Sequence, residues 1–245
     1  MNQLDYIVVI PARYESTRLP GKPLADIAGK PMIQMVYEQC IKAVESNRVY
    51  VATDDDRIRS VCESFGAKVV MTSSECLTGT DRVAEVSRKI DARYYINVQG
   101  DEPLFNPADI KLLVNQLNFE VDEIVMGYCS IHSKFDFENR AIPKMIFSEN
   151  KQLLYMSRSP IPGNKKDEFI RAWRQVCAYA FPKTSLDVFS SVDSKTSIEE
   201  IEDLEMLRFL EKGVSIKVIE MSSESIAVDH PEDIKKVLKR LKDEA

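Results

Sequence analysis

Three cations lie close together near the start of the chain, at Arg13, Arg18 and Lys22. They follow residues 6–10, Tyr-Ile-Val-Val-Ile, an apolar run that predicts a buried strand. A loop at the carboxyl end of such a strand is where open α/β sheets bind ligands, and cations there can neutralise a polyphosphate. The segment has neither a Walker A nor a G-x-G-x-x-G pattern, so side chains would have to hold the phosphates. Spacing alone also fits three solvated surface cations.

Two carboxylates are candidates for a magnesium site. Asp101 comes soon after the predicted strand 94–98, which places it at the same edge of the sheet as the basic loop. Asp229 follows the strand-like residues 226–228 and precedes Pro231, which begins a predicted helix. Simpler roles remain open: Asp101 as a turn carboxylate bonded to the backbone, and Asp229 as a helix cap.

A third group of polar residues precedes a helix predicted from about residue 80. Backbone amides at Gly79 and the hydroxyl of Thr80 could recognise a base or a sugar edge. The alternative is that Thr80 or Asp81 only caps the helix. The run of three aspartates at 54–56 is assigned mainly to helix initiation, because carboxylates favour the positive end of a helix.

Composition narrows the class of protein. The 245 residues suffice for a well-buried α/β core, and a net charge of −6 argues against a general nucleic-acid binder. No apolar run approaches the ~20 residues of a membrane span and no leader pattern is visible, so we expect a soluble, cytoplasmic protein without a membrane partner. Five cysteines without a C-x-x-C pair predict free thiols, and with only two histidines any metal would be held by carboxylates, as suits magnesium.

The spacing of apolar residues predicts alternating strands and helices. The expected strands are 6–10, 48–53, 68–71, 94–98, 124–131, 145–147, 174–181 and 215–219. The expected helices are 32–41, 56–65, from about 80, 184–191, 198–211 and from 231. The first four strands favour a parallel sheet with helices on both faces, and the later ones a mixed sheet, with a surface loop over 157–168. The fold class is therefore α/β, three layers around an open, mostly parallel sheet.

Five motifs, taken together, resemble the CMP-Kdo synthetase family, the 3-deoxy-manno-octulosonate cytidylyltransferases. They lie, in the family's order and spacing, at residues 10–24, 51–54, 79–82, 97–103 and 228–233. The resemblance implies a nucleotide-diphospho-sugar transferase-like (Rossmann-like) fold, with one cytidylyltransferase domain over 1–245 and a sugar-binding and dimerisation region within 120–220. It also implies a magnesium-dependent homodimer of lipopolysaccharide synthesis, which couples CTP to the anomeric hydroxyl of an acid sugar and releases pyrophosphate.

The resemblance also implies roles for single residues. The implied catalytic residues are Arg13, Arg18, Lys22 and Asp101, and the implied magnesium ligands are Asp101 and Asp229. The implied CTP-binding residues are Ala12, Arg13, Ser16, Lys22, Thr78, Gly79, Thr80 and Arg82. The implied sugar-binding residues are Gln99, Arg158, Gln175, Tyr179, Glu202 and Glu205.

The sugar half departs from the family pattern. Gln175 and Cys177 stand where the family usually has His and Gly, and Met206 replaces a Gln. Because a site built for hydroxyls discriminates strongly, the acceptor could be Kdo, a modified form such as 8-amino-Kdo, or another 2-keto acid sugar. The simpler explanation is neutral sequence change at positions that only support the sugar pocket.

Two other classes of function remain. A nucleotide-sugar glycosyltransferase usually carries an Asp-x-Asp pair after a strand, but residues 99–102 here read Gln-Gly-Asp-Glu. A non-catalytic nucleotide-binding protein would bind CTP without releasing pyrophosphate.

Overall fold

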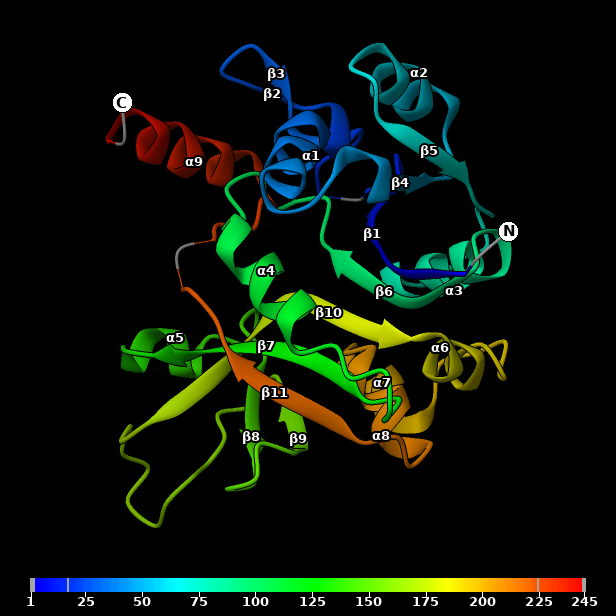
Figure 1. Cartoon of the computed structure of the whole chain (residues 1–245). Helices are drawn as coiled ribbons and strands as arrows, with labels where there is room; N and C mark the ends of the chain where they lie inside the picture. The colour runs from blue at the N-terminus through cyan, green and yellow to red at the C-terminus, as the bar shows by residue number, and fades with distance from the viewer. Residues whose placement is uncertain (1–2, 17, 224, 244–245) are drawn as a thin grey trace.

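A single mixed β-sheet runs through the molecule in the computed structural model, which describes residues 3–16, 18–223 and 225–243. Its strand order is β11-β7-β10-β6-β1-β4-β5 (Figure 1). One half of the sheet is parallel and is formed by β1 (Leu4–Ala12), β4 (Val49–Thr53), β5 (Lys68–Met71) and β6 (Ala92–Val98). All four strands match the sequence prediction.

The second half of the sheet is mixed, as expected. Its central strand β10 (Ala172–Pro182) runs antiparallel to both β6 and β7. The remaining strands are β7 (Ile124–Ile131), β8 (Lys144–Phe147), β9 (Leu153–Ser157) and β11 (Ile216–Glu220). β8 and β9 form an antiparallel extension beside β10, and β11 pairs in parallel with β7.

Helices cover both faces of the sheet, so the three-layer prediction is confirmed. Along β1, Ile7 and Val9 pack into one apolar cluster and Val8 and Ile10 into another, because successive side chains of a strand point to opposite faces. The first cluster includes side chains of α3 (Gly79–Lys89), α6 (Lys183–Phe189) and α8 (Met206–Glu211). The second includes side chains of α1 (Met32–Ala43), α2 (Asp56–Ser64) and α4 (Pro107–Asn115).

Several short elements and the C-terminal helix α9 complete the described part of the chain. They are η1 (Lys22–Leu24), β2 (Asp26–Ile27), β3 (Lys30–Pro31), η2 (Ser46–Arg48), α5 (Lys134–Glu138), α7 (Ser197–Glu202) and α9 (Pro231–Asp243). No helix in the described residues is both long enough and apolar enough to cross a membrane.

Three expectations about local structure were wrong or incomplete. The single helix expected over 198–211 is two helices, α7 and α8, because Asp203 between them adopts a left-handed conformation with φ of 51°. Residues 226–228 form no strand, although Val228 donates a backbone hydrogen bond to the carbonyl of Asp101. Neither α4, α5 nor β9 was predicted from the spacing of apolar residues. The loop over 158–171 is free of helix and strand, as expected.

Candidate active site

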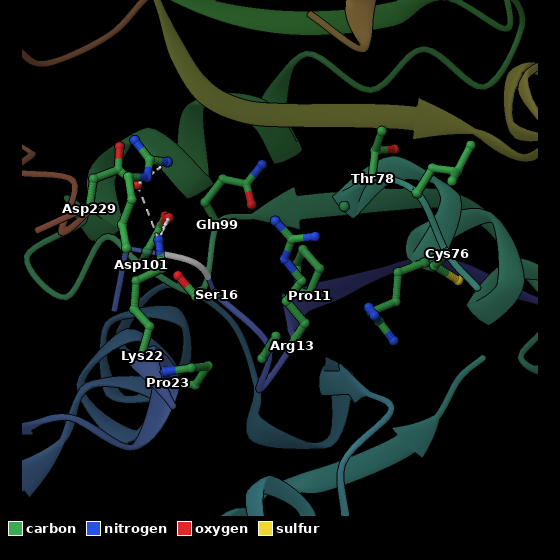
Figure 2. Close-up of a pocket in the computed structure, with 16 residues that line it drawn as sticks. Pro11, Arg13, Ser16, Lys22, Pro23, Cys76, Thr78, Gln99, Asp101 and Asp229 are labelled. Atoms are coloured by element: carbon green, nitrogen blue, oxygen red, sulfur yellow. Dashed lines mark hydrogen bonds and ion pairs between the residues drawn. The ribbon is translucent and has the colours of Figure 1, made fainter. Parts of the chain in front are cut away.

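A cavity of about 250 Å³ opens where β1 and β6 end (Figure 2). At one end it is lined by the basic loop and by Asp101 and Asp229, and at the other by residues 76–79 and Arg82. Gln99 lies between the two ends. The lining residues that the sequence had assigned to this site are Ala12, Arg13, Ser16, Arg18, Lys22, Thr78, Gly79, Arg82, Gln99, Asp101 and Asp229. Thr17, which is part of the basic-loop motif, lies outside the described residues.

Two cations of the basic loop, residues 13–22, form ion pairs with the two carboxylates. Lys22 Nζ lies 2.6 Å from Asp101 Oδ2 and 3.3 Å from Asp229 Oδ1, and an Nη atom of Arg18 lies 3.0 Å from the same Asp229 oxygen. Gly21 makes this geometry possible, because it takes a φ of 68° and packs against the ring of Tyr14. The sequence therefore correctly predicted that cations and carboxylates meet at one edge of the sheet.

Gly100 sets the approach of the two central strands. A Cβ at this position would lie 2.6 Å from the carbonyl oxygen of Pro11, so only glycine lets the chain after β6 pass so close to β1. That close approach brings Gln99 and Asp101 into the same cavity as the residues that follow β1.

The two carboxylates were predicted to bind magnesium. In the described residues, no group of three His, Cys, Asp or Glu side chains gathers to form a closed metal site. Magnesium, however, is usually bound by one or two carboxylates together with substrate phosphates. Asp101 and Asp229 already share one cation, the Lys22 ammonium, so this pair of donors fits a magnesium ion that arrives with a triphosphate.

The opposite end of the cavity begins α3. Thr78 is the N-cap: its Oγ1 accepts from the Asp81 amide, and Asp81 Oδ2 accepts from the Thr78 amide, which completes a capping box. Thr80 was expected either to bind CTP or to cap the helix. It is fully buried outside the cavity lining, and its amide donates to Glu205 Oε2 over 3.1 Å. Thr80 therefore supports the wall of the cavity from behind.

Arg82 is held by groups behind the cavity wall. Only 3% of its side chain is exposed, and its guanidinium donates to Thr72 Oγ1, to the carbonyl of Ser73 and, over 3.2 Å, to Asp54 Oδ2. The assignment of the 54–56 run to helix initiation is therefore right for Asp55, which caps α2, and wrong for Asp54.

A second cavity, also of about 250 Å³, shares Leu77, Thr78 and Gln99 with the first. Its other lining residues are Gln175, Cys177, Tyr179, Lys195, Glu199, Asp203 and Glu205. Four of the six predicted sugar-binding residues, Gln99, Gln175, Tyr179 and Glu205, therefore line one cavity. Lys195 was missed, because nothing in the sequence near it marks it as a cavity residue.

The remaining two predicted sugar-binding residues lie elsewhere. Arg158 and Glu202 line neither cavity and instead bind each other. Glu202 Oε2 accepts from the Arg158 amide over 2.8 Å, and Arg158 Nε donates to the Glu202 carbonyl over 2.6 Å. Burial alone would raise the pKa of Glu202, but hydrogen bonds from Ser157 and Arg158 outweigh it and lower the pKa. This clamp joins the end of β9 to the end of α7.

Charge and burial set the character of the second cavity. Burial raises the pKa of Glu205, and it raises the pKa values of Cys177 and Tyr179 well above their ordinary range. Asp203 is paired with Lys195 over 2.5 Å. Met206 is only 1% exposed and lies in the core, so of the three departures from the family pattern only Gln175 and Cys177 face the cavity.

The fold and the site are those of a nucleotidyltransferase. A solved structure of CMP:2-keto-3-deoxy-manno-octonic acid synthetase complexed with CTP superposes with a TM-score of 0.91 at 37% identity, covering 98% of this chain and 100% of that one. The family model described as cytidylyltransferase matches residues 7–219. The chain belongs to the cytidylyltransferase family.

Relatives of known name point to the same part of the family. An 8-amino-3,8-dideoxy-manno-octulosonate cytidylyltransferase of Shewanella sp. (strain W3-18-1) is 42% identical over 97% of this chain and 99% of the relative. A 3-deoxy-manno-octulosonate cytidylyltransferase of Trichlorobacter lovleyi is also 42% identical, over 98% of this chain and 99% of the relative. The resemblance to CMP-Kdo synthetases that the motifs indicated is therefore confirmed.

Proposed function

We propose that this protein transfers CMP from CTP to the anomeric hydroxyl of a 3-deoxy-octulosonic acid, Kdo or a modified form such as 8-amino-Kdo, and releases pyrophosphate. One observation carries the proposal: a cavity with three cations and two carboxylates at one end shares a wall with a second cavity lined by amide and carboxyl groups. Two substrates that must react with each other need adjoining sites. The names of the relatives supply the chemical class of both substrates.

The basic loop would hold the triphosphate. Arg13, Arg18 and Lys22 can donate hydrogen bonds to phosphate oxygens and stabilise the charge that develops on the leaving pyrophosphate. Asp101 and Asp229 would hold magnesium, whose charge adds to this stabilisation. The sugar oxygen bonds to the α-phosphorus as the bond to pyrophosphate breaks. Gln99, which lines both cavities, lies where it can orient the acceptor toward the nucleotide.

The acceptor is tested by measuring pyrophosphate release from CTP and magnesium with Kdo, 8-amino-Kdo, Kdn and neuraminic-type acids. Rapid release with Kdo would make Gln175 and Cys177 silent variation, and selectivity for another sugar would make them specificity residues. If CTP bound and no sugar supported release, the transferase proposal would fail in favour of a nucleotide-binding role. Transfer of the sugar from a UDP-sugar to an acceptor, with release of UDP, would support the glycosyltransferase alternative.

We also propose that the enzyme is a cytoplasmic homodimer that activates the sugar for lipopolysaccharide synthesis. Large apolar side chains exposed within 120–220 support an interface there. The most exposed are Val121, Phe135, Leu154, Ile170 and Ile201, with exposed fractions of 56% to 83%. Five free cysteines suit a reducing compartment. Sedimentation equilibrium measures the assembly, and replacing Leu154 and Ile201 by Ser should shift it toward monomer.

A further inference from the structure

The segment between β11 and α9 carries Asp229 from one half of the molecule to the other. In Figure 1 the edge strand β11 lies in the lower half of the view and α9 at the upper left, with α4 between them. We define residues 221–223 and 225–229 as the strap; Glu224 lies outside the described residues. The strap begins at Met221, whose amide donates to the Tyr128 carbonyl, and ends at Asp229 in the triphosphate cavity.

Two buried carboxylates hold the strap. Asp109, 3% exposed on α4, accepts from the Ser222 amide over 3.2 Å and from Ser222 Oγ over 2.5 Å. Glu102, 6% exposed, accepts from Ser225 Oγ. We call these two contacts the latches.

The latches lie next to the catalytic end of the cavity. Glu102 directly follows Asp101, and the carbonyl of Asp101 accepts from the Val228 amide over 2.9 Å. Lys22 then joins the side chains of Asp101 and Asp229. Figure 2 shows both carboxylates directed at this ammonium. One loop therefore supplies Asp101 and also fixes the strap that supplies Asp229.

Stability alone does not account for these carboxylates. A buried carboxylate costs free energy unless it is paired, and no lysine or arginine forms an ion pair with Glu102 or Asp109 among the described residues. Asp109 also does not cap its own helix, because Asn106 already does so. Among the described residues, the side-chain hydrogen bonds of both acids go to serines of the strap.

We propose that Glu102 and Asp109 are positioning residues, which through Ser225 and Ser222 set the place of the Asp229 carboxylate opposite Asp101. The inference rests on the proposed function, in which this pair of carboxylates receives magnesium with CTP. Fixing both carboxylates in advance lowers the cost of organising the site when nucleotide binds.

The test compares Ser225→Ala and Ser222→Ala with the wild type. Binding of α,β-methylene-CTP is measured by calorimetry over a range of Mg²⁺ concentrations, so that the readout does not depend on turnover. We expect the Mg²⁺ concentration for half-maximal binding to rise about ten-fold, as is usual when a partner that orients a metal ligand is lost. Affinity for the analogue without Mg²⁺ should stay unchanged. Ser225→Thr, which keeps the hydroxyl, should restore the wild-type Mg²⁺ dependence.

A matched control separates positioning from general weakening of the fold. Ser190→Ala removes a serine hydroxyl that donates to the Leu186 carbonyl in α6, away from both cavities, and should leave the Mg²⁺ dependence unchanged. The inference is overturned if both strap variants lower the melting temperature while their Mg²⁺ dependence matches that of the wild type. Ser222→Ala retains the backbone contact to Asp109, so it keeps the test informative if Ser225→Ala does not fold.

Failure of the proposed function is distinguishable from failure of the latches. If the wild type binds the analogue with Mg²⁺ but releases no pyrophosphate with any acid sugar, the proposed reaction is wrong while the calorimetric result on the strap still stands. If wild-type binding does not depend on Mg²⁺, the role of Asp229 is wrong, and the inference about its positioning residues is wrong with it.

Discussion

Lys22 Nζ lies 2.6 Å from Asp101 Oδ2, in the cavity at the carboxyl ends of β1 and β6. The contact joins two residues 79 positions apart in the sequence, one from the basic loop and one from the loop after the central strand. Because Asp229 shares the same ammonium, the cavity holds two anionic side chains around one cation. Two carboxylates around one cation form the arrangement in which we propose that magnesium binds together with the triphosphate.

Replacing Asp101 by Asn should lower kcat far more than it raises KM. The substitution keeps the size of the side chain and removes the charge, and groups that stabilise a developing charge are worth roughly 10² to 10³ in kcat. Steady-state pyrophosphate release with CTP and the accepted sugar measures the effect. Near-normal turnover in magnesium would remove Asp101 from the metal site.

Asp54→Asn should weaken CTP binding. The carboxylate is the charged partner of the buried Arg82 guanidinium, which lines the nucleotide cavity, and a hydrogen bond to a charged group is worth about 1.5 to 3 kcal/mol. We expect KM for CTP to rise by about ten-fold or more. Asp55→Asn is the matched control: Asp55 caps α2, and Asn is an equally good N-cap, so KM should not change. Equal effects of the two variants would contradict the assignment of Asp54 to Arg82.

Gln175→Ala should change the choice of acceptor, and Met206→Leu should not. Gln175 lines the second cavity, whereas Met206 is buried in the core, where a change that conserves volume usually costs less than about 1.5 kcal/mol. The ratio of kcat/KM for Kdo and 8-amino-Kdo gives the answer for each variant. A shift in this ratio for Met206→Leu alone would show that the core position governs selectivity.

Arg208→Met should destabilise the fold by about 3 to 5 kcal/mol, because it leaves a buried carboxylate unpaired. Arg208 is 1% exposed and binds both oxygens of the fully buried Glu199 at 2.7 Å, and it reaches Asp81 at 3.1 Å. Urea unfolding at neutral pH measures the loss. Lys134→Met breaks only an exposed pair with Glu138 on α5 and should cost at most about 0.5 kcal/mol. A loss for Arg208→Met no larger than that of the control would argue against this network.

Glu202→Gln should destabilise the protein at neutral pH and progressively less in acid. Burial opposes ionisation of Glu202, but hydrogen bonds from Ser157 and Arg158 lower its pKa in the folded state. A lowered pKa stabilises the fold fully above the unfolded value of about 4.3, and this contribution is lost as the pH falls through the folded pKa. We expect a difference of about 1 to 2 kcal/mol at pH 7 that shrinks below pH 4 in urea titrations. A difference independent of pH would mean that the charge of Glu202 does not hold the clamp.

Local patterns in the sequence predicted the parallel half of the sheet well. An apolar strand such as residues 6–10, or helical spacing such as that of 32–41, can be recognised from a few neighbouring residues. The basic loop and Asp101 could then be placed because each follows a predicted strand. The break at Asp203 was not predictable in this way, because residues 198–211 all tolerate a helix and the break depends on one left-handed residue.

Long-range contacts explain the other differences. Asp54 and Asp55 look alike in the sequence, and only Arg82, 28 residues further on, separates their roles. The latch between Glu102 and Ser225 spans 123 residues and leaves no local pattern at either end. Arg158 and Glu202 were expected at the sugar, but hydrogen bonds between them, visible only in the folded chain, join the end of β9 to the end of α7.

The helix that follows Asp229 rests on a core of its own. α9 contributes Val237 to a small apolar cluster with Ile27, Met32 and Val228, separate from the two clusters that cover the main sheet. Units with few buried apolar contacts open at a lower free energy than the whole molecule. Warming should therefore release this corner first, so catalysis would cease while the sheet remained intact, and the temperature of inactivation would lie below that of global melting.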